Sequence, residues 1–466
     1  MQLRQELAGI ANRNITPGTY SCFLGAGAYP HFIPSVVKAI ISRGEFLTSY
    51  TPYQPEVSQG TLQATYEFQS LICLLTEMDV ANAGMYDGAT ALAEAALMAC
   101  RVSNRTKIVS LSSVNPRYQE VVGTYAIPQG LTLESCPIDD LNVDKNTACV
   151  LVQSPNFFGS ITPLDKLAEL THSAGALLVA SVDPISLGLF NPPGKQGVDI
   201  VVGECQSLGA PMTYGGPFVG LFACKQEFIR QMPGRIVGKT LDHSGRTGFV
   251  LTLQTREQHI RRERATSNIC TAQVLLAIMS GMYAVYHGPQ GIRRIAEQIH
   301  QNTCDLAASL TAAGYKIHND IFFDTIRVTG PDNIVDKARN SGINIRDFSD
   351  GTVGIALDET VTINDLKNLL TQFDTDHSPA ADSVIPSELQ RKSAFLTHPV
   401  FNRFQSETEM LRYIHRLETK DLSLNTSMIP LGSCTMKLNA TAEMVGVTWP
   451  EFGGLHPFAP QDQAKG

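Results

Sequence analysis

The sequence lacks several features that mark secreted, zinc-binding and membrane proteins. Its ten cysteines are widely scattered, with no CxxC pair and no spacing typical of zinc ligands. No run of about 18 apolar residues occurs, so we predict no transmembrane helix and no membrane partner. Residues 1–7 are polar and carry charges of both signs, unlike a secretion or transit signal. We therefore expect a cytoplasmic protein with reduced cysteines and no bound metal.

Positive charge is also in short supply. The chain has 36 Lys and Arg residues against 44 Asp and Glu residues, which gives a formal net charge of −8. An acidic surface does not attract phosphate backbones, so we expect no nucleic-acid partner. Hydrophobic residues make up 43% of the chain and charged residues 17%, an ordinary globular composition. Because 466 residues exceed the size of a single core, we expect two or three domains.

Short apolar segments alternate with helical patterns through the middle of the chain. Residues 148–153 and 176–182 are apolar runs with the length of buried strands, and a helical pattern over 163–173 separates them. Further strands are predicted at 107–111 and 200–202. Strands and helices that alternate at this spacing predict an α/β domain whose mostly parallel sheet is covered by helices on both faces.

A smaller α+β unit is predicted after this domain. Helical patterns near 292–313 and 363–373 flank predicted strands near 326–328 and 352–356. A polar, proline-containing stretch that follows is typical of a linker. The predicted organisation is an N-terminal arm and interface loop (1–60), the large domain (61–288), the small domain (289–373), the linker (374–387) and an extension (388–466).

A proline- and tyrosine-rich stretch, LTSYTPYQPEVSQG, lies before the α/β pattern at residues 47–60. Its prolines favour extended geometry in the residues before them, so we predict an ordered, extended loop. A rigid loop with two phenols can line a small polar pocket, or it can pack at a subunit interface. Under the first interpretation, its site residues are Tyr50, Tyr53, Gln54 and Glu56.

Two features follow predicted strands, at the sheet edge where parallel sheets bind their ligands. Residues 86–90 (YDGAT) open a helix, and backbone N–H groups at a helix N-terminus can hold an anion. The alternative for this stretch is a helix cap followed by tight packing. Asp183 ends the most apolar strand, where it either pairs with a ligand or caps the turn before Pro184.

A run of charged residues at 256–271 ends in the polar residues Thr266, Ser267 and Asn268. A solvated helix is the usual meaning of such a charge run. The functional alternative is an anion contact made across a subunit interface by Thr266 and Ser267.

The strand-end residues resemble the site of pyridoxal-phosphate enzymes of the aspartate aminotransferase fold type, fold type I. In that fold type, an Asp in the position of Asp183 pairs with the pyridine nitrogen, and a lysine roughly 20–25 residues later forms the Schiff base. Residues 199–211 contain no lysine, and Ser207 stands near the expected position. A hydroxyl cannot form an imine, so we expect this chain not to hold pyridoxal phosphate covalently.

Together, five stretches resemble the P-protein of the glycine cleavage system, a glycine decarboxylase. The similarity to its N-terminal half, subunit 1 of the two-chain form, extends to about residue 373. Residues 396–439 resemble the opening of the second half. The five stretches are 50–60, 85–90, 232–235, 256–271 and 283–289.

This resemblance implies a pyridoxal-phosphate enzyme of two homologous halves that decarboxylates glycine and passes the aminomethyl group to lipoyl H-protein. The second half would carry the lysine and the cofactor, and this half would complete the active site across the interface. Thr266 and Ser267 would reach the partner's cofactor phosphate, as a similar Arg-Ala-Thr-Ser-Asn segment does in cysteine desulfurase-like members of the fold type. Ser433, Thr435 and Lys437 would approach the same pocket.

Two alternatives compete with this interpretation. A stand-alone pyridoxal-phosphate aminotransferase or decarboxylase requires a Schiff-base lysine, and Ser207 counts against it. A non-catalytic scaffold or regulatory subunit would make no use of Tyr53 or Thr266. We also expect the chain to be inactive alone, as either a fragment of a long single-chain P-protein or the product of a split gene.

Overall fold

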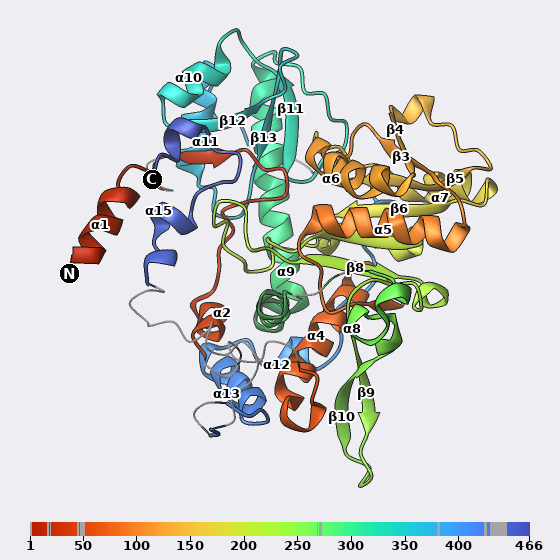
Figure 1. The fold of residues 1–466 in the computed structure, drawn as a ribbon. Coiled ribbons are helices and arrows are strands. Elements are labelled where there is room, and N and C mark those ends of the chain that lie inside the picture. Colours follow the sequence, from red (N-terminus) through yellow and green to blue (C-terminus); the bar gives the residue numbers. More distant parts are fainter. Residues whose placement is uncertain are drawn as a thin grey trace.

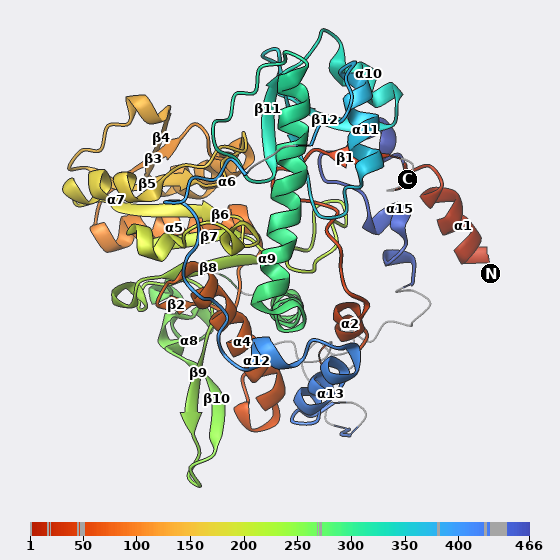
Figure 2. The same cartoon turned by 180° about the vertical axis from the view of Figure 1, so that it is seen from behind.

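The computed structural model places an α/β body beside a smaller domain, with a long hairpin projecting from the body (Figures 1 and 2). A helix at the N-terminus, α1 (Gln2–Ala11), extends away from the rest of the chain (Figure 1). The structure describes residues 2–466 except 16–17, 19, 44–45, 47–51, 268, 270–272, 380–382, 424–425 and 429–444. Within these described ranges, no helix is long and apolar enough to cross a membrane.

The body is built on a seven-stranded sheet in the order β2-β8-β7-β6-β5-β3-β4. The strands from β7 to β4 run parallel, whereas β8 is antiparallel to both of its neighbours. This confirms the predicted mostly parallel sheet. The strands are β2 (Val80–Ala81), β3 (Lys107–Leu111), β4 (Thr132–Cys136), β5 (Thr147–Gln153), β6 (Leu177–Val182), β7 (Ile200–Glu204) and β8 (Gly220–Cys224).

The central strands form because their residues are apolar on both faces. In β5, β6 and β7 nearly every residue is buried, without the polar–apolar alternation of a half-exposed strand. Helix α5 packs against β5, β6, β7 and β8, and α7 packs against β6. The helices of the body are α4 (Gln59–Thr76), α5 (Gly88–Ser103), α6 (Pro116–Ala126), α7 (Leu164–Ser173) and the short α2 (Ser35–Lys38) and α8 (Gln258–Arg261).

The small domain has a four-stranded sheet in the order β1-β12-β13-β11. Its first strand comes from the predicted N-terminal arm and pairs in parallel with β12, more than 300 residues later. The sequence patterns did not predict β1 or β12. The elements are β1 (Ser21–Phe23), β11 (Thr325–Thr329), β12 (Ile343–Asp347), β13 (Thr352–Ala356), α10 (Ile334–Asn340) and α11 (Ile363–Gln372).

A long helix, α9 (Val274–Ala312), connects the two sheets (Figure 2). It breaks at Gly288, whose φ of 62° and ψ of −179° are not helical. Pro289 follows and lacks the N–H that would continue the helical hydrogen bonds. The break therefore falls at the boundary predicted between residues 288 and 289.

The hairpin of β9 (Ile236–Leu241) and β10 (Thr247–Thr252) projects from the body and was not predicted (Figure 1). The extension after residue 388 contributes α12 (Val400–Arg403), α13 (Glu407–Glu418) and α15 (Pro450–Gly453). Helix α13 packs against α4.

The extension also caps the first turn of α4. The Asp421 carboxylate accepts hydrogen bonds from the backbone N–H groups of Gly60 (2.6 Å) and Thr61 (3.0 Å). These N–H groups have no partner within the helix, and a carboxylate at this end also complements the helix dipole. The extension thereby holds the residues that directly follow the loop at 47–60.

We predict that Gly60→Ala lowers the free energy of unfolding by about 1–3 kcal/mol. A Cβ atom at Gly60 would lie 1.9 Å from the Leu417 carbonyl oxygen, so α13 and α4 would have to separate. Urea unfolding measures the change. The matched control is Gly9→Ala in α1, where a Cβ meets nothing within 4 Å and the exposed helix gains up to about 1 kcal/mol. Equal stability of the wild type and Gly60→Ala would contradict the packing of α13 on α4.

Candidate functional site

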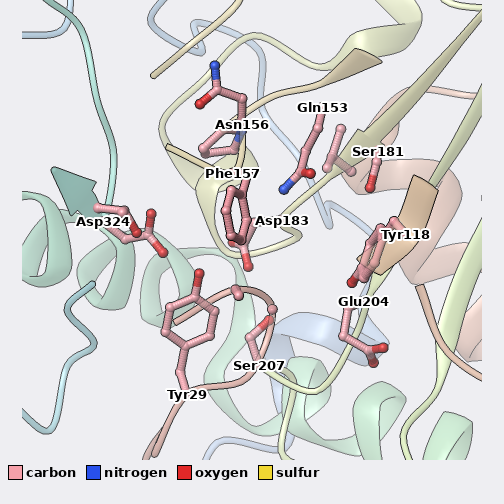
Figure 3. Close-up of a pocket in the computed structure, with 15 residues that line it drawn as sticks. Tyr29, Tyr118, Gln153, Asn156, Phe157, Ser181, Asp183, Glu204, Ser207 and Asp324 are labelled. Atoms are coloured by element: carbon pink, nitrogen blue, oxygen red, sulfur yellow. The ribbon is translucent and has the colours of Figure 1, made fainter. Parts of the chain in front are cut away.

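A small cavity lies at the carboxyl ends of β5, β6 and β7, as expected for a parallel sheet (Figure 3). Its volume is about 50 Å³. It brings together Asp183 and Ser207, the two residues that the sequence singled out in this region. Its other polar lining includes Tyr29, Tyr118, Gln153, Asn156, Ser181, Glu204 and Asp324.

Asp183 lies at the end of β6 with its carboxylate on the cavity (Figure 3). Its Oδ1 atom accepts a hydrogen bond of 2.8 Å from the backbone N–H of Ser186, so it also caps the turn after the strand. Burial and the nearby carboxylate of Asp324 raise the pKa of Asp183 to about 6. The turn-capping interpretation of Asp183 therefore describes this structure, whereas its pairing with a ligand stays a prediction.

A buried histidine carries positive charge near these acids. The Nδ1 atom of His31 lies 2.6 Å from Oε2 of Glu359. Burial alone would lower the pKa of His31, but the Glu359 carboxylate raises that pKa to about 9. The imidazolium in turn favours the charged forms of Asp183 and Asp324.

Ser207 lies just beyond β7, where the fold type would place its lysine. Its side chain lines the cavity, and the residue is only 2% exposed. Its hydroxyl has no hydrogen-bond partner among the described residues. Among those same residues, no lysine lines the cavity.

The predicted anion position at the start of α5 is filled by the chain itself. Gly88, the first residue of α5, donates its backbone N–H to Oε2 of Glu204 (2.9 Å). Asp87 and Thr90 form a capping box, as the helix-cap interpretation expects. The Asp87 side chain accepts a hydrogen bond from the Thr90 backbone N–H, and the Thr90 hydroxyl accepts one from the Asp87 backbone N–H. Burial raises the pKa of Glu204 well above its usual range, although the Gly88 donor opposes this.

The cavity does not fit pyridoxal phosphate. A volume of about 50 Å³ is far below the roughly 300 Å³ of the smallest typical small-molecule pockets. The side chains of Tyr29, Tyr118 and Phe157 enter this space (Figure 3). Ser207 cannot form an imine, and Glu204 occupies the anion position. The residues present therefore do not form a pyridoxal-phosphate site.

A second cluster, formed by the side chains of Arg235 and Glu257, supports Tyr53 in the described part of the loop at 47–60. The Tyr53 hydroxyl accepts a hydrogen bond of 2.8 Å from Nη2 of Arg235, whose guanidinium carbon lies 5.4 Å from the centre of the Tyr53 ring. The Nε atom of Arg235 lies 3.2 Å from Oε2 of Glu257. The Arg235 and Glu257 side chains are only 8% and 9% exposed, whereas Tyr53 is 42% exposed. A buried ion pair thus holds a phenol that faces solvent.

Two other candidate residues of the loop, Gln54 and Glu56, are also exposed to solvent. Gln54 precedes the short 3₁₀ turn Pro55–Val57, which contains Glu56. Tyr50 lies outside the described residues, as do Ser433, Thr435 and Lys437.

Thr266 and Ser267 lie half-buried beside the residues that support Tyr53. The Thr266 hydroxyl donates to the Met232 carbonyl oxygen (3.1 Å), and the Ser267 hydroxyl donates to Oε1 of Glu94 on α5 (3.0 Å). The Thr266 backbone N–H donates to the Arg256 carbonyl oxygen (3.0 Å). In the described part of the charge run, only α8 is α-helical, so the run is not one long solvated helix.

Several residues of the cavity and of the Tyr53 cluster were not predicted from the sequence. Glu204 could have been noticed as an acid at the end of an apolar strand, and Arg235 belongs to a stretch already singled out. Tyr29, Tyr118 and Asp324 come from distant segments and carried no local signal. No group of three or more His, Cys, Asp and Glu side chains in the described part of the chain could hold a metal ion.

Comparison with known proteins identifies the family of this chain. The profile of the family described as "Glycine cleavage system P-protein" matches residues 1–373. Glycine dehydrogenase (decarboxylating) of Thermosynechococcus vestitus is 46% identical over 475 residues, which cover 99% of this chain and 49% of the relative. The same enzyme of Nostoc punctiforme is 47% identical, over 96% of this chain and 48% of the relative. The chain spans about half the length of these relatives.

Solved structures support the fold. The crystal structure of a glycine decarboxylase (P-protein) in inhibitor-bound form has a TM-score of 0.76 and 41% identity, over 80% of this chain and 88% of that one. Aspartate aminotransferase of Thermus thermophilus has a TM-score of 0.51 and 14% identity, over 77% of this chain and 96% of that one. The predicted fold, fold type I of the pyridoxal-phosphate enzymes, is thereby confirmed. On the profile match and these identities, the chain belongs to the P-protein family of the glycine cleavage system.

Proposed function

We propose that this chain is the half of a glycine decarboxylase that lacks the Schiff-base lysine and completes the active site of a lysine-bearing second half. One observation carries the proposal: among the residues that the structure describes, no lysine lines the cavity at the ends of β5, β6 and β7, and this cavity is too small for the cofactor. A chain of this family with such a cavity can contribute to decarboxylation only through surfaces that a partner uses.

In this proposal the second half holds pyridoxal phosphate, which supplies the electron sink that decarboxylation of glycine requires. The aminomethyl group then passes to the lipoyl arm of H-protein. The present chain binds and orients groups at the edge of that site and excludes water from it. Correct placement of reacting groups accounts for a large part of many enzymatic rate enhancements.

We propose that Tyr50, Tyr53, Gln54 and Glu56 form this edge. The hydroxyl of the exposed residue Tyr53 is held by Arg235, which the Glu257 carboxylate holds in turn. A phenol fixed in this way can donate a hydrogen bond to a polar group of the partner's site without first losing conformational freedom.

We further propose that Thr266 and Ser267 contact the partner's cofactor phosphate. In this chain their hydroxyls donate to the Met232 carbonyl oxygen and to Glu94. The contact therefore requires each hydroxyl to rotate from its present acceptor to a phosphate oxygen. A phosphate oxygen accepts a stronger, charge-assisted bond than the neutral Met232 carbonyl oxygen does, which favours the exchange at Thr266.

The test is Tyr53→Phe in the complete two-half enzyme. We expect kcat/KM for glycine to fall at least about 10-fold, which corresponds to about 1.4 kcal/mol of lost transition-state stabilisation. Exchange of the glycine carboxyl group with labelled bicarbonate measures the rate. Tyr214→Phe is the matched control, because Tyr214 is an exposed tyrosine outside both clusters.

The exchange rates of the variants, together with the absorbance spectrum of the purified chain, distinguish the alternatives. A scaffold without an active-site role predicts full rate for both Tyr53→Phe and Thr266→Ala. A stand-alone pyridoxal-phosphate enzyme predicts that the purified chain absorbs near about 420 nm and loses this band with borohydride.

A further inference from the structure

The N-terminus of α5 presents a polar site that is already occupied. Backbone N–H groups in the first turn of a helix lack partners within the helix and bind anions well. Here Gly88 donates to Oε2 of Glu204 (2.9 Å), and Oε1 of Glu204 accepts from the backbone N–H of Gln206 (3.1 Å). Both oxygens of one carboxyl group therefore receive backbone donors, as two oxygens of a bound phosphate would.

The carboxyl group is held in place from several sides. Glu204 is the last residue of β7 and is only 9% exposed. A Cβ atom at Gly88 would lie 2.8 Å from the Tyr118 hydroxyl and 3.0 Å from the Glu204 nitrogen, so only glycine allows this approach. The end of β7 and the start of α5 therefore lie in close contact at Glu204.

A second observation indicates that a polar ligand could enter beside Glu204. The Ser207 hydroxyl is buried, has no hydrogen-bond partner among the described residues and lines the same cavity as Glu204 (Figure 3). The cavity already contains about 50 Å³ of free space. Removing the Glu204 side chain would join this space to the exposed N–H of Gly88.

We propose that Glu204 is an internal ligand that takes the place of a phosphate group at the start of α5. It closes the cavity to phosphate-bearing ligands, and beneath it lies a latent phosphate site formed by α5 and Ser207. The inference concerns this chain alone and does not depend on how the chain acts with a partner. Its consequence is that phosphorylated small molecules cannot bind here in place of the partner's site.

The experiment measures thermal unfolding of the purified chain with increasing inorganic phosphate at constant ionic strength, adjusted with chloride. For Glu204→Ala we expect the Tm to rise by at least about 2 °C at about 20 mM phosphate, along a saturating curve. For the wild type and for Glu204→Gln we expect no phosphate-dependent rise, because a side chain of the same size still fills the position.

Glu67→Ala is the matched control. Glu67 is a buried glutamate on α4 whose carboxylate accepts a hydrogen bond from Tyr413, and it does not line the cavity beside Ser207. Loss of a buried carboxyl group in general should not create a phosphate response. If Glu204→Ala does not fold, Glu204→Ser carries the same expectation.

Two outcomes would overturn the proposal. One is a saturable phosphate response in the wild type, which would mean that Glu204 does not close the site. The other is a folded Glu204→Ala or Glu204→Ser protein that responds to phosphate no more than the wild type.

Discussion

Purified alone, this chain should not exchange the carboxyl group of glycine with bicarbonate, whereas adding it to a lysine-bearing second half should raise that half's rate at least about 100-fold. The second half by itself would hold the cofactor but lack the residues that place glycine against it, and misplacement of about 1 Å can cost a factor of this size. The small cavity beside Ser207, whose described lining contains no lysine, explains why the present chain should contribute nothing alone.

The experiment compares the second half with and without the present chain. The second half is assayed alone, with an equal amount of an unrelated protein, and with increasing amounts of this chain until the rate saturates. Saturation at equal amounts of the two halves is expected. A mixture no faster than the second half alone would refute the shared site, and exchange by this chain alone would revive the stand-alone enzyme.

The second large effect concerns the ion pair behind Tyr53. Replacing Arg235 by Ala should lower the free energy of unfolding by about 3–5 kcal/mol, because it removes a buried cation that lies 3.2 Å from the Glu257 carboxylate. The pair is almost inaccessible to solvent, with side chains 8% and 9% exposed, so water cannot replace the lost partner. The same change removes the donor that holds the Tyr53 hydroxyl.

Urea unfolding of the purified chain measures this loss. Arg117→Ala is the matched control, because Arg117 pairs with Glu120 on the surface, and exposed pairs contribute at most about 1 kcal/mol. If Arg235→Ala and Arg117→Ala were equally stable, the Arg235–Glu257 pair would not be the support of the Tyr53 loop.

The fold of the body could be predicted because its signals are local. The strands β5 and β6 are continuous apolar runs, and their length and separation by helices indicate a covered parallel sheet. The strand β1 could not be predicted in this way. It has only three residues, and it forms because β12, more than 300 residues away, offers a parallel edge.

The residues of the candidate sites could likewise be predicted only where their signals are local in the sequence. Asp183 and Ser207 were found from their positions after predicted strands, and they do line one cavity. Residues 86–90 were identified as a possible anion site, but no sequence pattern showed that Glu204 would fill it, 116 residues further along the chain. The contact between Tyr53 and Arg235 joins residues 182 positions apart and was equally invisible.

The sequence by itself thus determined the family, the sheet and the absence of a lysine near position 207, because residue type alone settles which side chains can form an imine. Only the tertiary structure decided that the cavity is small, that Glu204 occupies the start of α5, and that the exposed residue Tyr53 packs on a buried ion pair. The physical reason is that a side chain's chemistry is a local property. Its partners and its access to solvent depend on segments that meet only when the chain folds.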